Sequence, residues 1–341
     1  MNRIENPFLK DGRILRKTSI NRLKVMGIPG LDIEEDVKGK KGVDLVSNEV
    51  IMEYIKNNAK KLKFDLDIIP DNELPIKLNE SFDSDDLEVR LTAENIARRL
   101  GRNLGYILLV LRRGDKINQD SREDYYIDRV FEEAITPKFN VQIAQEPSLI
   151  SIVGAARHLP SNYESALVLD FGQTLVKRSV VNYEGEEIKE VTKLPSVESK
   201  YVYEYIFDDE EREKSQGEQL KDYMITIIKD AWKKAKERGF EPCNTIVMSI
   251  ADNLTDGQFS GGGYAKLRLV EGGFRELASK KLSDATGEDI KFIFVHDGTA
   301  AADAFSGVKN SVIVTVGTAL GLGFPLEKEG LRPVSEDIKF T

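Results

Sequence analysis

Residues 166–181 read A-L-V-L-D-F-G-Q-T-L-V-K-R-S-V-V, an apolar run that ends at Asp170, a glycine turn and a second run rich in β-branched residues. This pattern predicts a strand, a tight turn and a returning strand. The turn places the Asp170 carboxylate beside the Thr174 hydroxyl, and Gly172 lets the backbone approach a ligand closely. Such a turn can bind phosphate oxygens and a hard cation such as magnesium. Taken alone, D-F-G-Q-T is more often an ordinary hairpin turn, so other parts of the chain must decide between the two.

The length and composition indicate a chain of about two domains. It has 341 residues, of which 40% are hydrophobic, and this is enough to form sizeable cores. The net charge is −9 at pH 7. An acidic balance of this kind argues against a nucleic-acid-binding surface.

The use of cysteine and of apolar runs favours a cytoplasmic protein. A single cysteine, Cys243, excludes an intramolecular disulfide and fits a reducing compartment. Together with only two histidines, it leaves no structural zinc cluster. Residues 1–6 are polar and carry no signal-peptide core. The apolar run at 106–111 is far too short to span a bilayer, so we expect no membrane association.

The spacing of apolar residues predicts the remaining elements. Ser47 and Pro147 suit the first residues of helices, and Gly101 and Gly105 indicate close packing of a long helix against another element. The predicted helices span residues 47–62, 87–111, 123–135, 147–159, 211–238 and 273–287. The predicted strands span residues 141–144, 176–183, 187–194, 245–250, 292–295 and 311–316, with shorter strands within 22–25 and 64–77.

Polar residues follow two of the predicted strands. Asp252 and Asn253 come after strand 245–250, where they can hydrogen-bond a polyol or form an Asx-turn. Strand 292–295 leads into His296 and Asp297, followed by small residues that begin a helix. An aspartate in that place suits a general base. His296 can contact a ligand, although a structural hydrogen bond is the commoner role of a histidine at a strand end.

A second glycine-rich turn follows strand 311–316. Residues 317–323 read G-T-A-L-G-L-G. Their backbone N–H groups can surround a phosphate. The chain therefore offers two phosphate-type turns after strands, with an acidic residue between them.

Three motifs together resemble the sugar kinases of the actin-like ATPase superfamily, and most closely the ROK family (repressors, open reading frames and sugar kinases). They are D-x-G-x-T at 170–174, D-G-T-A-A-A at 297–302 and G-T-x-L-G-x-G at 317–323. The resemblance implies an α/β fold with two ribonuclease-H-like domains around a cleft. The cleft would bind ATP, Mg²⁺ and a sugar or sugar-like small molecule, and the reaction would transfer phosphate to a hydroxyl.

The resemblance also implies roles for individual residues. Asp170 matches the magnesium-associated aspartate, which holds the ion directly or through water, and Asp297 matches the catalytic base. The ATP phosphates would be bound by Gly172, Gln173, Thr174, Gly317, Thr318, Gly321 and Gly323. The acceptor would be bound by Asp252, Asn253 and His296.

The order of the motifs differs from that of the family. In those kinases the first phosphate motif lies near the N-terminus, whereas here 165 residues precede its strand. Residues 91–111 and 141–159 resemble the family's long helix and its closing strand and helix. We therefore predict a circular permutation. The first domain would span 161–290, with the closing helix 147–159 able to pack on it, and the second would combine 1–146 with 291–341.

One departure from the family keeps two other functions open. The segment 111–116 reads L-R-R-G-D-K, a single glycine where the family has a glycine-rich adenosine loop. The chain is then either a sugar kinase, a non-catalytic binding protein with the actin-like fold, or an ATPase of the same superfamily that acts on a partner protein. We expect no nucleic-acid partner, and a homodimer remains open.

Overall fold

The structure is a computed structural model, in which the chain forms two compact units. Unit 1 comprises Met1–Asn140 and Val314–Leu322, and unit 2 comprises Val141–Ile313 and Gly323–Thr341. The residues that the structure describes are 9–10, 13–14, 20–28, 30–113, 142–202, 209–252, 254–255, 258–259, 263–308, 311–318 and 320–341. The predicted helix at 123–135 and the candidate Asn253 lie outside these residues.

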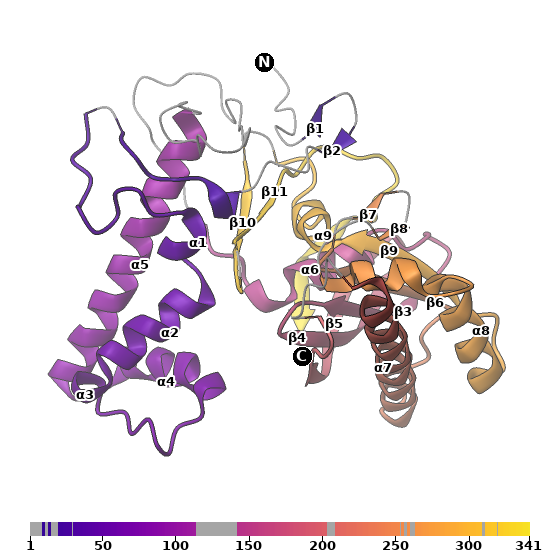
Figure 1. Ribbon diagram of the computed structural model, residues 1–341. Coiled ribbons are helices and arrows are strands. Elements are labelled where there is room, and N and C mark those ends of the chain that lie inside the picture. Colours follow the sequence, from indigo (N-terminus) through magenta and orange to yellow (C-terminus); the bar gives the residue numbers. More distant parts are fainter. Residues whose placement is uncertain are drawn as a thin grey trace. The chain divides into compact units, whose positions relative to one another are not determined.

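Unit 2 is built on a six-stranded mixed sheet (Figure 1). The strands lie in the order β12-β5-β4-β3-β6-β9, and β4 alone runs antiparallel to its neighbours. Their bounds are β3 (Ser165–Phe171), β4 (Leu175–Glu184), β5 (Glu187–Glu198), β6 (Thr245–Ile250), β9 (Lys291–His296) and β12 (Val334–Phe340). The predicted run of three antiparallel strands is thus confirmed as β3, β4 and β5.

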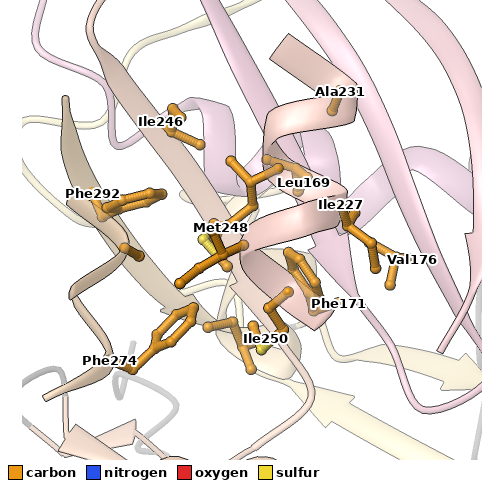
Figure 2. Close-up of a cluster of buried hydrophobic side chains, with 14 of the residues drawn as sticks. Leu169, Phe171, Val176, Ile227, Ala231, Ile246, Met248, Ile250, Phe274 and Phe292 are labelled. Carbon is orange, nitrogen blue, oxygen red and sulfur yellow. The ribbon is translucent and has the colours of Figure 1, made fainter. Parts of the chain in front are cut away.

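Helices cover both faces of this sheet because successive side chains of a strand point to opposite faces. Leu167, Leu169 and Phe171 of β3 pack in a core with α7 (Glu210–Glu237) and α8 (Phe274–Thr286). Figure 2 shows part of this core, in which Leu169 and Phe171 lie with Ile227 and Ala231 of α7.

The opposite face of the sheet has a core of its own. Ala166 and Val168 of β3 pack there with Ile152 and Val153 of α6 (Ile150–Ala156) and with α9 (Asp297–Asp303). The short helix η5 (Pro147–Leu149) precedes α6, so the predicted helix 147–159 is shorter than expected. The α/β class is confirmed by this sheet with helices on both faces.

Unit 1 is mainly helical in its described part. Its helices are α1 (Gly42–Leu45), α2 (Asn48–Asn57), α3 (Ala59–Leu62), α4 (Leu74–Glu80) and α5 (Leu87–Arg113). The Ser47 hydroxyl accepts a hydrogen bond from the Val50 N–H at 3.3 Å, which confirms the predicted N-cap. Apolar side chains of α2, α3, α4 and α5 form the core of the unit.

Strands play a small part in unit 1. In its described residues they form the pair β1 (Leu9–Lys10) and β2 (Arg13–Ile14) and the ribbon of β10 (Ile313–Val316) and β11 (Leu320–Gly323). The strands predicted within 64–77 are wrong, because the second half of that segment forms the start of α4. Residues 142–144 carry no strand either.

The contacts group the C-terminal part of the chain differently from the predicted domains. Residues 291–313 and 323–341 belong to unit 2. The reason is strand pairing: β9 pairs with β6, and β12 pairs with β5. Within the described parts of the chain, no helix combines the length and the apolar character that crossing a bilayer requires.

Candidate functional site

The site in unit 2 lies at the carboxyl edge of three parallel strands. Asp170 is near the end of β3, and Ser249 pairs with it from β6. One residue further along β6, Ile250 pairs with His296, the last residue of β9. Asp297 follows as the first residue of α9. Because the strands are parallel, their carboxyl ends meet at one edge, which is the usual ligand-binding edge of α/β sheets.

Asp170 is a buried carboxylate with a donor on each oxygen. Its exposed fraction is 4%. Oδ1 accepts a hydrogen bond from the Ser249 hydroxyl at 2.8 Å. Oδ2 accepts one from the Lys177 ammonium at 3.2 Å. The ammonium compensates the carboxylate charge, which a buried acid requires.

Lys177 was missed in the sequence, although a signal for it was present. In the hairpin of β3 and β4, Asp170 pairs directly with Lys177. The predicted turn at 172–174 fixes this register, so the partner of Asp170 could have been found by counting back across the turn.

The first turn, residues 172–174, is held by several hydrogen bonds. The Gly172 N–H donates to the Leu175 carbonyl at 3.2 Å and closes the turn. The Gly172 carbonyl accepts hydrogen bonds from the Tyr264 and Ser199 hydroxyls, each at 2.7 Å. The Thr174 carbonyl accepts one from the Ser199 N–H at 2.9 Å. The shape of the turn therefore depends on residues that are distant in sequence.

His296 caps helix α9. Its Nδ1 accepts a hydrogen bond from the Thr299 N–H at 3.2 Å. Nδ1 therefore carries no proton, so Nε2 carries the ring proton. Nε2 lies 3.1 Å from Asp297 Oδ1, close enough for electrostatic attraction between the two side chains. The structural hydrogen bond that we expected of His296 is confirmed.

Asp297 combines a partly exposed side chain with a raised pKa. Its side chain is 42% exposed. Desolvation by the surrounding protein raises its pKa above that of an ordinary aspartate, the neighbouring His296 lowers it, and the negative charge of Asp170 raises it again. The net direction is upward. A carboxylate of raised pKa is a better proton acceptor at neutral pH.

The second turn, Gly317 and Thr318, belongs to unit 1. The Gly317 carbonyl accepts a hydrogen bond from the Asn48 N–H at 2.8 Å. The Asn21 side chain then holds β11, because it accepts from the Leu320 N–H at 2.7 Å and donates to the Leu320 carbonyl at 3.0 Å. The structure thus gives this turn its own support. Its predicted meeting with Asp170 across a cleft stays a prediction.

Two of the predicted glycines are required by packing. A Cβ on Gly321 would lie 2.2 Å from the Thr315 hydroxyl oxygen. A Cβ on Gly323 would lie 2.4 Å from the Gly298 carbonyl oxygen, at the start of α9. A close backbone explains Gly323 and a close threonine side chain explains Gly321, so the presence of these glycines alone is no evidence for a phosphate.

Asp252 directly follows β6. It is buried, with an exposed fraction of 4%. Because its neighbour Asn253 lies outside the described residues, the choice between a polyol site and an Asx-turn stays open.

Asp170 fits an indirectly bound magnesium ion better than a preformed metal centre. Among the described residues, no group of three or more His, Cys, Asp or Glu side chains is placed to hold a metal. Each Asp170 oxygen accepts one hydrogen bond and retains a further lone pair. Magnesium in phosphate sites typically uses one or two carboxylates, with water and phosphate oxygens completing its shell.

Comparison with family models and curated sequences gives no relative to compare the site with. No protein-family model matches this chain. No curated protein sequence matches it either. The function has to be argued from the geometry of the site.

Proposed function

We propose that this chain is an ATP-dependent kinase that phosphorylates a hydroxyl of a sugar or sugar-like small molecule, with Asp297 as the general base. The observation that carries the proposal is the arrangement of Asp170, Lys177 and Asp297 beside the turn at 172–174. One carboxylate is buried and charge-compensated, whereas the other is on a partly exposed side chain and has a raised pKa. Two acids whose surroundings differ in this way suit two different roles.

The topology of unit 2 supports the same proposal. Within the sheet, β5-β4-β3-β6-β9 lie in the spatial order third, second, first, fourth and fifth along the chain, with the second antiparallel. This order is compatible with the ribonuclease-H-like domain that the proposal requires. Both ribonuclease-H-like domains and the circular permutation remain part of the proposal, and the second domain and the permutation rest on the sequence motifs alone.

The roles of the residues follow from the needs of phosphoryl transfer, which are positioning and charge neutralisation. Backbone N–H groups of the first turn would bind phosphate oxygens, and Lys177 would supply a positive charge beside them. Asp170 would hold Mg²⁺, which neutralises phosphate charge when bound. Asp297 would take the proton of the acceptor hydroxyl, and the Gly298 N–H, which donates to its Oδ1 at 2.7 Å, orients the carboxylate.

Two measurements test the proposal. Millimolar Mg-ATP should raise the melting temperature of the protein by mass action, and a panel of sugars should include one that is phosphorylated. Asp297→Asn should keep the fold by circular dichroism and lose turnover by a factor of about 10²–10⁴. Asp289→Asn, an exposed aspartate before β9, is the matched control and should keep full activity. Full turnover in Asp297→Asn would remove this residue as the base.

The non-catalytic alternative has one observation in its favour. The Lys177 ammonium already lies on Asp170, where it competes with any cation. If Mg-ATP produces no stabilisation at millimolar concentration, the binding-protein function is preferred. If ATP is consumed without any acceptor, the ATPase function is preferred.

A further inference from the structure

The Gly172 carbonyl receives two hydroxyl donors that play no chemical role in the proposed reaction. Tyr264 comes from η6 (Gly263–Leu269), and Ser199 follows the end of β5. Both hydroxyls lie 2.7 Å from the same carbonyl oxygen. A carbonyl oxygen has two lone pairs, so these two bonds use its full capacity and fix its direction.

A fixed carbonyl also fixes the next N–H. The described chain contains no cis peptide bond. In a planar trans peptide the C=O and N–H groups point in opposite directions. Because the Gly172 carbonyl points toward Tyr264 and Ser199, the Gln173 N–H points away from them. The direction of an N–H group in the first turn is therefore set by these two side chains.

Tyr264 is itself rigidly placed. Its exposed fraction is 1%, and its ring packs edge-on against Phe171 with centroids 6.3 Å apart. Two residues later, the buried Lys266 ammonium donates to the Tyr201 carbonyl at 2.7 Å and to Gln216 Oε1 at 2.6 Å. These bonds tie η6 to α7 and to the segment after β5. The Phe171 ring and the hydrogen bonds of Lys266 thus fix the position of Tyr264, and Tyr264 can in turn fix the position of the turn.

We propose that Tyr264 and Ser199 are positioning residues that keep the first turn in the conformation that binds nucleotide phosphate. This inference rests on the proposed function, because it requires that the turn binds ATP. Neither residue touches the reacting atoms. Each acts by directing the peptide between Gly172 and Gln173.

The test uses variants that remove one hydroxyl each. Tyr264→Phe keeps the ring and its packing on Phe171, and Ser199→Ala keeps the backbone N–H that bonds Thr174. Each should raise the KM for Mg-ATP about fivefold, the factor expected from one hydrogen bond. The turnover number should change little, because the turn would contact the phosphates equally in the ground and transition states.

A matched control separates positioning from stability. The Tyr163 hydroxyl donates to Asn244 Oδ1 at 3.3 Å near the opposite, amino end of β3 and β6. Tyr163→Phe should therefore leave the KM for Mg-ATP unchanged. In the protein without nucleotide, amide hydrogen exchange of residues 172–175 should be faster in Tyr264→Phe than in Tyr163→Phe.

The outcomes are distinguishable. If the wild-type protein binds no Mg-ATP, both the proposed function and this inference fail. If the wild type binds Mg-ATP and Tyr264→Phe binds it equally well, with unchanged exchange of residues 172–175, only the positioning role fails. A fivefold rise in KM that Tyr163→Phe does not share supports it.

Discussion

The two glycine-containing turns are supported in different ways. The first turn joins two long strands of a six-stranded sheet, and hydroxyls from two further elements fix its carbonyl. The second joins two four-residue strands of a ribbon and is held by the side chain of Asn21 and the N–H of Asn48. The first is therefore part of a folded core, whereas the second depends on a few polar contacts. The comparison shows that turns with similar glycine patterns can be stabilised by very different surroundings.

Glycines within helices also differ between the two units in how closely they are packed. A Cβ on Gly154 of α6, in unit 2, would lie 1.6 Å from the Ala300 carbonyl oxygen of α9. A Cβ on Gly101 or Gly105 of α5, in unit 1, would meet no described atom within 4 Å. The close packing predicted for Gly101 and Gly105 is thus not found among the described residues, and it is found at Gly154.

The largest expected effect comes from replacing one glycine of α6 and one of α5 by alanine. Gly154→Ala should lower the free energy of unfolding by about 2–3 kcal/mol, because α6 and α9 must separate to admit it. Gly101→Ala should raise that free energy by up to about 1 kcal/mol, because alanine is the better helix former and has open space. Urea unfolding of both variants measures the difference. If both variants changed the free energy of unfolding in the same direction, the contrast in packing would be contradicted.

A smaller effect is expected when the support of the second turn is removed. Asn21→Ala deletes both side-chain hydrogen bonds to Leu320 and should cost about 1–2 kcal/mol locally. Amide hydrogen exchange should become faster at residues 317–323 and stay unchanged at 172–175. Asn58→Ala, which removes a side-chain bond to the Tyr54 carbonyl elsewhere in unit 1, is the control. Equal acceleration in both variants would show that Asn21 has no special role.

The smallest effect concerns the pH dependence of stability. The folded protein raises the pKa of Asp297, so ionised Asp297 destabilises the fold at pH values above its folded pKa. This penalty disappears as the pH falls below the unfolded value of about 4. Asp297→Asn should therefore melt higher than the wild type at pH 8, and this difference should shrink as the pH falls and vanish below about pH 4. Thermal melts across that range measure it, and a variant that melts lower at pH 8 would refute the raised pKa.

The long periodic elements of the fold were predictable from the sequence. Strand β6 was predicted with its observed bounds, and α7, α8 and β9 were predicted to within one or two residues. Each buries one face or the whole element, so the periodicity of its apolar residues reports its structure directly.

Residues that interrupt or end helices and strands were harder to interpret. Pro75, in the segment 64–77 where strands were predicted, lies in the first turn of α4, where the missing N–H is not needed. The predicted helix 47–62 is interrupted at Asn58, whose side chain bonds the Tyr54 carbonyl. The grouping of β9 and β12 with unit 2 depends on pairing between strands distant in sequence, which no local pattern records.

In the candidate site, too, the local motifs were predictable from the sequence and the tertiary contacts were not. The Asp170 and Asp297 motifs were readable because each follows an apolar strand. The contacts of Tyr264 and Ser199 were not predictable, because both residues are distant in sequence and only the tertiary fold brings them to the turn. Lys177 was missed although the hairpin register places it opposite Asp170.

The close approach of α6 and α9 has a consequence for recognising similar chains. Gly154, in a run with Ala155 and Ala156, lies against Ala300, the first of three alanines of α9, across a contact that leaves no room for a methyl group at position 154. Two short runs of small residues, separated by well over a hundred positions, therefore depend on each other through one close contact between helices. A distant homologue that has changed every polar residue of the site should still keep both runs, or lose both together.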